Sequence, residues 1–287
     1  MKFGIIPAYG AASVETGDYA TLVARLAEEL GFESIWPVEH VVMAAEYKSR
    51  YPYDPSGRMP IERAAIPDPL TWLAWVAAVT RHLKLGTAVV ILPQRNPLVL
   101  AKTVASLDRL SDGRVLLGVG LGWMREEAEA VGVSFDDRGA RADEYIEAMR
   151  ALWTQPVASY RGEHISFENV SCNPLPARPG GVPIYIGGHT PAAARRAGRL
   201  GDGFLPLAAG LEEILRLREI MQESARKAGR EPGEIEISCV GPPNPEIAKA
   251  YAEAGIARMI VPSLEADIEA TKRKLGEFSA KVMSALA

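Results

Sequence analysis

The sequence predicts an α/β protein that folds as one (β/α)8 TIM barrel, and three observations lead to this prediction. Short β-branched or apolar runs alternate with helical patterns, as parallel βαβ units require. Eight such runs can be counted, which is the number of strands that closes this kind of barrel. The chain has 287 residues, and barrels of about 250 residues commonly form one domain. We therefore expect a single domain over residues 1–287.

The eight predicted strands are almost continuously hydrophobic, as strands must be when helices cover a parallel sheet. They are Phe3–Pro7, Ser34–Glu39, Leu83–Leu92, Arg114–Leu121, Pro183–Gly188, Gly203–Leu207, Glu234–Gly241 and Arg258–Ser263.

The helices between these runs show apolar stripes at helical spacing. The first is expected to begin after Asp18 as its N-cap and to end at Gly31. Its stripe is Tyr19, Leu22, Val23, Leu26, Ala27 and Leu30. A later stripe over Leu211–Met221 ends near Gly229.

Two insertions interrupt the alternation, one after the second strand and one after the fourth. Residues Val41–Asp68 are rich in proline and tyrosine, too long and irregular for a simple connection. Val157–Pro179 resembles a short hairpin with its turn near Tyr160–His164. We expect Val41–Asp68 to be a mobile lid that selects the substrate, since its tyrosines offer flat amphipathic surface. The alternative is a rigid excursion that packs against a dimer partner.

Composition and charge exclude some classes of function. The formal net charge of −4 and pI near 5.7 give no basic face for nucleic acid or a membrane surface. The opening segment lacks a signal-peptide pattern and no stretch of about 18 apolar residues occurs, so we expect a cytoplasmic protein. Cys172 and Cys239 lack the spacing of a redox pair or a zinc site and are expected to be reduced and structural.

The pair Glu39-His40 ends the second strand, where a barrel places its active site. His40 is therefore a candidate catalytic residue, either a proton donor or a contact to a cofactor ring. A histidine satisfied by local hydrogen bonds remains the alternative. A metal site is not predicted, because only His189 could join His40 at the strand ends.

The run Gly118–Trp123 ends the fourth strand. Its glycines, including Gly120 and Gly122, remove side chains so that something flat can approach the backbone. The run does not fit a dinucleotide fingerprint, because no acidic residue ends a second strand some 20 residues on. A plain strand-to-helix turn is the alternative.

The segment Gly187-Gly188-His189-Thr190-Pro191 follows the fifth strand and opens a helix. Thr190 is a good N-cap and Pro191 a natural first residue. The helix start offers an anion site, and the glycines admit a phosphate. Alone it could equally be a capped turn. Together with the glycine-rich strand it favours a planar, phosphorylated cofactor.

These features resemble the luciferase-like flavin and deazaflavin oxidoreductases, especially the branch of F420-dependent oxidoreductases, and the resemblance spans nearly the whole chain. The blocks that carry it are Leu30–Trp36 leading to Glu39-His40, Gly86–Val89 leading to Arg95–Pro97, Leu107–Arg114, Tyr185–Gly188, and Ala197–Phe204.

The resemblance implies a cofactor ring over the barrel mouth, with its phosphate near Gly187-Gly188 and His40 facing the ring. It also implies a cis non-prolyl peptide within Thr87-Ala88-Val89, which would support the ring from behind. This sequence departs from the sugar-phosphate and alcohol dehydrogenases of the family at one position, because Trp123 stands where they have a glutamate. The proton donor of those enzymes is therefore not transferable, and a tryptophan wall favours an apolar or aromatic substrate.

The predicted function is hydride transfer between coenzyme F420 and a small organic substrate. The first alternative is an FMN-dependent monooxygenase that uses reduced flavin and oxygen, and the second is a non-catalytic flavin-binding protein. A barrel hydrolase is disfavoured, since no cluster of His and Asp ligands marks the strand ends. The family resemblance and the apolar helix 68–82 also predict a homodimer. A separate flavin or F420 reductase partner stays open.

Overall fold

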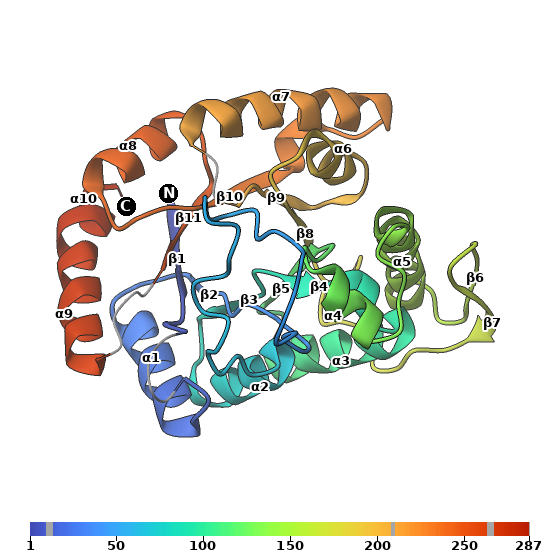
Figure 1. Cartoon of the computed structure of the whole chain (residues 1–287), viewed down its shortest axis with the longest axis horizontal. Helices are drawn as coiled ribbons and strands as arrows, with labels where there is room; N and C mark the ends of the chain where they lie inside the picture. The colour runs from blue at the N-terminus through green and yellow to red at the C-terminus, as the bar shows by residue number, and fades with distance from the viewer. Residues whose placement is uncertain (10–13, 208–209, 263–266, 287) are drawn as a thin grey trace.

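The computed structural model describes residues 1–9, 14–207, 210–262 and 267–286. Within these residues nine strands close into a parallel barrel in the order β3-β2-β1-β11-β10-β9-β8-β5-β4, and an additional pairing joins β3 to β5 (Figure 1). Their bounds are Lys2–Ile6 (β1), Ser34–Ile35 (β2), Lys84–Gly86 (β3), Val90–Ile91 (β4), Val115–Gly120 (β5), Ile184–Gly187 (β8), Gly203–Leu205 (β9), Glu236–Val240 (β10) and Arg258–Pro262 (β11).

Each of the eight predicted runs contains strand residues, so the predicted barrel is confirmed. The predicted end of the last run, Ser263, lies outside the described residues. The third run is divided into β3 and β4, which both pair with β5. Between the partners Gly86↔Leu116 and Val90↔Val119, the third strand advances four residues (90 − 86) while β5 advances three (119 − 116). One extra residue on one strand is a β-bulge.

An outer layer of helices covers the barrel (Figure 1). The longer helices are Gly17–Glu29 (α1), Pro69–Val79 (α2), Pro97–Leu110 (α3), Arg138–Thr154 (α5), Pro191–Leu200 (α6), Leu211–Lys227 (α7), Pro245–Glu253 (α8) and Ile268–Phe278 (α9). Shorter turns are Leu92–Gln94 (η1), Arg125–Ala130 (α4), Pro232–Glu234 (η2), Ser279–Met283 (η3) and Ser284–Leu286 (α10). None of the helices in these described stretches is both long and apolar enough to cross a membrane.

Helix α1 shows how the sequence sets these elements. The predicted N-cap at Asp18 is wrong, because the side chain of Thr16 accepts the cap hydrogen bond from the Tyr19 N–H. Both residue types can cap, and the chain enters the helix two residues earlier than the apolar stripe indicates. The predicted end at Gly31 is confirmed by its φ of 82°, a left-handed conformation that glycine adopts readily.

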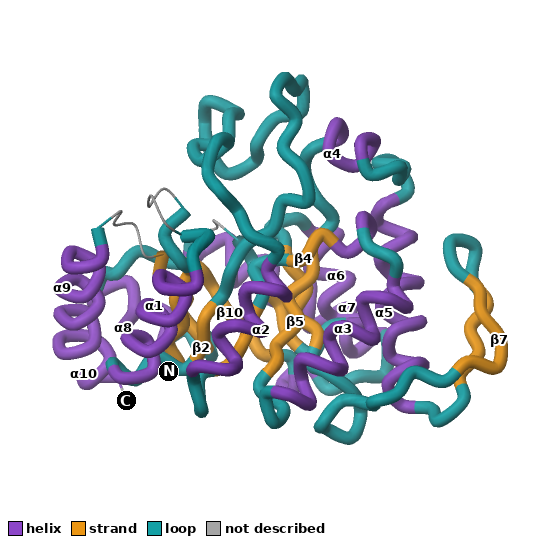
Figure 2. Tube along the Cα trace, turned by 90° about the horizontal axis from the view of Figure 1, so that it is seen from below, coloured by secondary structure: helices purple, strands orange, loops and turns teal. Residues whose placement is uncertain are grey.

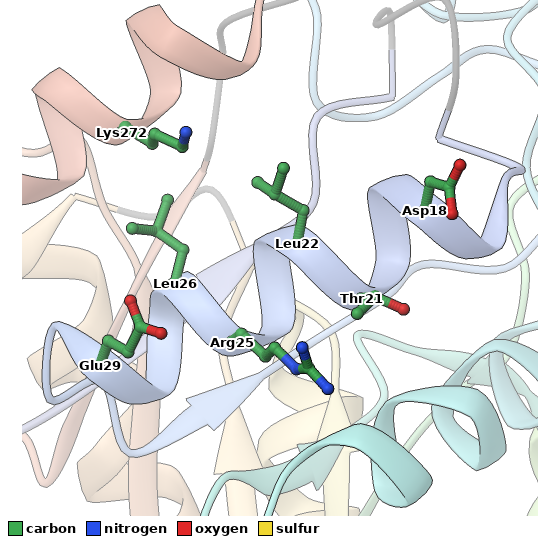
Figure 3. A pocket seen from close by; sticks show the side chains of 7 residues that line it. All are labelled: Asp18, Thr21, Leu22, Arg25, Leu26, Glu29 and Lys272. Atoms are coloured by element: carbon green, nitrogen blue, oxygen red, sulfur yellow. The ribbon is translucent and has the colours of Figure 1, made fainter.

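The outer side of α1 meets α9 across a groove lined by both helices (Figure 3). Leu22 and Leu26 of the predicted stripe line this groove and are half-buried, and Leu26 also packs against the core. Val23 and Ala27 are fully buried.

The core has two parts. One lies between the barrel and its helices, and the other fills the barrel with Trp36, Ala88, Leu116, Tyr185, Leu205 and Ile260. A Cβ at Gly86 would lie 2.2 Å from the Trp36 ring, so this glycine makes room for the indole. The amino-terminal ends of the strands form the floor, where the guanidinium of Arg258 donates to Glu33, Glu236 and Ser238.

Both predicted insertions are present. The first, which we call the β2 insertion (residues 41–68), contains no regular strand or helix. Long loops rise from one end of the barrel, the end at which α4 lies (Figure 2). The second contains the predicted hairpin, formed by Ala158–Arg161 (β6) and Ser166–Val170 (β7). This hairpin lies beyond α5 and not over the strand ends (Figures 1 and 2).

Candidate functional site

The bulge in the third strand carries a cis peptide bond between Ala88 and Val89. This confirms the cis linkage expected within Thr87–Val89. The bulge is tied to its neighbours on both sides, because the Thr87 hydroxyl donates to the Gly118 carbonyl over 2.7 Å and the Ala88 N–H donates to the Pro37 carbonyl over 2.9 Å.

The glycines at the strand ends make room for this bulge. A Cβ at Gly118 would lie 1.9 Å from the Thr87 carbonyl oxygen, and Cβ atoms at Gly120 and Gly187 would lie 2.5 and 2.7 Å from Val89 methyl groups. We predicted that such glycines admit a flat ligand to the backbone. In the structure the bulge itself fills the space that these glycines leave. They therefore affect a ligand indirectly, by setting the position of Val89.

The Glu39 carboxylate connects neighbouring elements of the fold. Its carboxylate accepts hydrogen bonds from the Ile91 N–H over 2.5 Å and from Arg95 Nε over 2.9 Å, and Arg95 also pairs with Asp68, the N-cap of α2. Burial raises the pKa of Glu39 and outweighs the opposing effect of Arg95. The Glu39 carboxylate thus ties the end of β2 to η1 and α2. Glu39 is, with His40, also a predicted cofactor contact from the sequence, and this role stays a prediction.

His40 lies beside a buried carboxylate that the sequence analysis did not assign to the site. Its Nδ1 is 3.0 Å from Oε2 of Glu127, a residue of α4. The other carboxylate oxygen accepts the N–H of Val41 over 2.7 Å and more weakly the N–H of Val42 over 3.4 Å. The side chains of His40 and Glu127 are 8% and 0% exposed. The predicted catalytic histidine is thus one half of a buried pair.

Aromatic rings of the β2 insertion extend from this pair across the strand ends. Tyr47 and Tyr51 meet the Trp123 ring edge-on, with centroids 5.5 and 5.2 Å away, and His40 meets it at 5.9 Å. Tyr53 meets the ring of His189 at 5.1 Å. Burial, followed by the neighbouring Tyr51, raises the pKa of Tyr53 to about 12, so its phenol stays protonated. The insertion therefore joins the end of β5 to the end of β8.

Glu126 fastens the same insertion. Its carboxylate accepts the Lys48 N–H over 2.7 Å and the Ser49 hydroxyl over 2.7 Å. These hydrogen bonds, the Lys48 backbone first, lower the pKa of Glu126 to about 2. Consecutive glutamates of α4 thus bind two parts of the β2 insertion, Glu127 its start and Glu126 its middle.

Six buried side-chain polar atoms have no hydrogen-bond partner in the described residues; three of them lie at the start of α5, on Asp137, Arg138 and Arg141, and three follow strands. The three that follow strands are Trp123 Nε1 after β5, Gln94 Oε1 after β4 and His189 Nδ1 after β8. A buried polar atom without a partner is costly, and native proteins rarely leave one without a reason. Such atoms are free to bind water or a ligand. Gln94 is not among the predicted site residues, because no motif or strand end singles it out.

The helix cap predicted at the start of α6 is confirmed, whereas the anion site there stays a prediction. The Thr190 side chain caps the helix by accepting from the Ala193 N–H over 3.2 Å, and Pro191 is the first helical residue. Gly188 has a φ of 130°. A Cβ there would lie 3.0 Å from the Ala193 methyl group, so the turn is closed to larger residues.

A group with the spacing of metal ligands lies elsewhere. Among the described residues, Glu144, Glu163 and His164 bring ligand atoms within 4.8 Å of one another. The Glu144 carboxylate accepts the backbone N–H groups of Glu163 and His164 over 3.0 and 2.8 Å. These contacts fasten the hairpin to α5, far from the strand ends, and this group takes no part in the candidate site.

A parallel barrel with its polar side chains gathered at the carboxyl ends of the strands has the architecture of the (β/α)8-barrel enzymes. Residues 1–280 match the family model described as luciferase-like monooxygenase, and the chain belongs to this family.

Relatives and solved structures place the chain among diverse members. It is 33% identical over 250 residues to an uncharacterised protein of Mycobacterium tuberculosis, covering 85% of this chain and 87% of that one. It is 36% identical over 238 residues to the F420-dependent glucose-6-phosphate dehydrogenase of Nocardia farcinica, covering 79% of this chain and 66% of the enzyme. The fold is shared with a monooxygenase of Streptomyces bottropensis at a TM-score of 0.83 and 24% identity, over 100% of both chains.

Proposed function

We propose that the protein is an oxidoreductase that transfers a hydride between coenzyme F420 and a small organic substrate. The observation that carries the proposal is the set of buried, unpartnered polar atoms of Gln94, Trp123 and His189 at the barrel mouth, beside the His40–Glu127 pair. The similarity to an F420-dependent dehydrogenase supports this choice of cofactor.

The residues at the mouth suit a planar, phosphorylated group. The bulge at Ala88-Val89 and the ring of Trp123 would border its planar part, and the turn Gly187–Thr190 with the start of α6 would receive a phosphate. When bound, a deazaflavin supplies a carbon that accepts or returns a hydride. The protein contributes orientation, a site shielded by the β2 insertion, and proton movement at His40.

The aromatic surface around Trp123 favours an apolar or aromatic substrate. Tyr47 and Tyr51 approach the indole, and Trp123 occupies the place where the family's sugar-phosphate dehydrogenases have a glutamate. A flat apolar surface with one N–H donor suits a ring or a carbonyl-bearing compound better than a sugar phosphate. This substrate class differs from the one in the name of the Nocardia relative.

The second candidate function is an FMN-dependent monooxygenase. The full-length fold similarity to the Streptomyces monooxygenase favours it. Both cofactors present a flat ring system and a phosphate, so both suit the same site.

Anaerobic titration of the purified protein with F420 and, separately, with FMN tests these proposals. We expect saturable changes in the absorbance and fluorescence of F420, followed by turnover with members of a panel of aromatic alcohols and carbonyl compounds. Saturable binding of FMN alone, with oxygen-dependent turnover of its reduced form, would replace the proposal by the monooxygenase. Tight cofactor binding without turnover across the panel would instead support a non-catalytic flavin-binding protein.

We also propose that the protein is a homodimer. Trp75 of α2 is 53% exposed and Val99 of α3 is 65% exposed, and a second copy would cover such exposed apolar side chains. Light scattering at micromolar concentration should give twice the mass of 31.0 kDa. A monomeric mass would contradict this proposal and leave the proposed activity untouched.

A further inference from the structure

The carboxylate of Glu127 is completely buried, and its hydrogen-bond partners among the described residues are two backbone N–H groups and one ring nitrogen. Oε1 accepts the N–H groups of Val41 and Val42, over 2.7 and 3.4 Å. Oε2 is 3.0 Å from Nδ1 of His40. A backbone N–H can only donate, so Oε1 is committed to the start of the β2 insertion and Oε2 to the histidine.

This arrangement determines which nitrogen of a neutral His40 carries the proton. A neutral imidazole has one N–H and one lone pair, and its hydrogen-bond partner decides between the two forms. An ionised carboxylate can only accept, so Nδ1 donates to it. Nε2 then keeps the lone pair, and it has no hydrogen-bond partner among the residues that the structure describes.

We propose that Glu127 is a positioning residue that holds His40 in its Nδ1–H form, so that Nε2 is the nitrogen that accepts a proton or hydrogen bond from a ligand. The proposal rests on the proposed function for the identity of that ligand, but the proton position can be measured without one. It also gives Glu127 a second effect, because the same carboxylate fixes the first two amides of the β2 insertion.

The substitution Glu127→Gln makes a sharp test, since an amide has one accepting oxygen and one donating NH2 group. The two backbone N–H groups need the oxygen, which leaves the NH2 group facing His40. Nδ1 must then accept, so the proton moves to Nε2. The proposal therefore predicts that Glu127→Gln inverts the form of His40 while the side chain keeps its shape. An equivalent exchange behind the histidine of serine proteases lowers kcat about 10⁴-fold through the wrong tautomer.

Nitrogen NMR of ¹⁵N-histidine-labelled, cofactor-free protein distinguishes the two forms, because protonated and unprotonated ring nitrogens differ widely in chemical shift. The chain has four histidines, and His40→Gln assigns the His40 signals. At a pH where the ring is neutral, we expect Nδ1–H in the wild type and Nε2–H in Glu127→Gln. The matched control is Glu126→Gln, whose carboxylate binds Lys48 and Ser49 and not the histidine. It should retain the wild-type form.

Each outcome decides the proposal. A wild-type ring protonated at Nε2, or an unchanged Nδ1–H form in a folded Glu127→Gln, would overturn it. A folded state is verified by the amide NMR spectrum, and Glu127→Asp serves as a second carboxylate variant that should retain Nδ1–H. Once a substrate is known, Glu127→Gln should lower kcat at least about 100-fold with little change in KM. Inversion of the tautomer without cofactor binding would leave this inference intact and refute only the proposed function.

Discussion

Both ends of the barrel contain buried polar and aromatic side chains. In the described residues, only the buried polar side chains of the floor have all their hydrogen-bond partners within the protein. On the floor, Arg258 is 1% exposed and its guanidinium donates to Glu33, Glu236 and Ser238. The Tyr185 hydroxyl donates to Glu236 over 2.8 Å, and Trp36 Nε1 donates to Ser34 over 2.8 Å. None of these side chains has a buried polar atom left without a partner in the described residues.

The mouth contains the same residue types, but some of its buried polar atoms have no hydrogen-bond partner among the described residues. The indole N–H of Trp36 has a partner, whereas that of Trp123 has none among the residues that the structure describes. A buried polar network stabilises a fold when all its members are satisfied, and an unsatisfied one lowers stability. This contrast is expected if the floor serves stability and the mouth binds a ligand, as proposed above.

The largest effect should come from breaking the floor. Arg258→Met leaves the carboxylates of Glu33 and Glu236 without their shared cation. Because these side chains are 27% and 23% exposed, we expect the lower end of the cost of a broken buried pair, about 3 kcal/mol of unfolding free energy. For a chain of this size the thermal midpoint should fall by about 6 °C or more.

Thermal and denaturant unfolding measure this loss. The matched control is Arg216→Met, which breaks the exposed pair with Glu213 and should cost less than about 1 kcal/mol. Cofactor affinity of the folded Arg258→Met protein should equal that of the wild type. An unchanged stability in this variant would show that the floor network does not hold the barrel together.

At the mouth, His40→Ala should lower turnover strongly and stability only a little. We expect turnover to fall about 100-fold or more, since proton transfer by a positioned side chain contributes about 10² to 10⁴. The loss of unfolding free energy should be smaller than for Arg258→Met. Steady-state kinetics and denaturant unfolding measure the two quantities, and His82→Ala on the exposed surface is the matched control. Unchanged kinetics in His40→Ala would end its assignment as a catalytic residue.

The fold could be predicted from the sequence more fully than the site at the mouth. The strands could be located because strands buried on both faces must be continuously apolar. Their length could not, since Ser34–Glu39 shortens to Ser34–Ile35 where Trp36 turns into the barrel. Cap choice between Thr16 and Asp18 depends on the direction in which the chain enters α1, which neither residue type reveals.

A site residue could be predicted from the sequence only where its position at the end of a strand was enough to place it at the mouth. His40 could be found because it ends a strand. Glu127 could not, because its contact with His40 joins residues 87 positions apart in the sequence. The purpose of Gly120 was also hidden, since the Val89 side chain that fills its space comes from the bulge of another strand.

Trp123→Phe should have an intermediate effect and tests the contrast of the two indoles directly. The substitution removes an N–H that has no partner in the fold, so unfolding free energy should change by less than about 1 kcal/mol. If a ligand accepts from this N–H, its Kd should rise about tenfold, which corresponds to about 1.4 kcal/mol. Fluorescence titration with the cofactor and with substrates measures the Kd values.

The matched control is Trp36→Phe on the floor, where the indole N–H is bonded to Ser34. We expect this variant to lose stability and to keep its ligand affinity. Identical ligand affinities in Trp123→Phe and the wild type would mean that no ligand uses the indole N–H.

The smallest effect should be a local loosening of the β2 insertion in Glu126→Ala. The substitution removes the acceptor of the Lys48 N–H and the Ser49 hydroxyl, while Glu127 still holds residues 41 and 42. Hydrogen exchange followed by mass spectrometry should show faster exchange around residues 48–53, with the barrel strands unchanged. Glu129→Ala is the matched control on the same helix, because the Glu129 carboxylate lies 3.9 Å from Arg125 and has no other ion pair among the described residues.

The pH dependence of this contact has a definite sign. The folded-state pKa of Glu126 is about 2, below its ordinary value of 4.5, so the contact contributes stability that is fully present above about pH 4.5 and is lost as the pH falls toward 2. If the insertion is a lid, its amides in the wild type should exchange fast without cofactor and slow on binding, and Glu126→Ala should raise the fast component in both states. Uniformly slow exchange with and without cofactor would refute the lid and favour a rigid excursion packed against a dimer partner, because a segment that must open for a ligand cannot be protected to the same degree before and after binding.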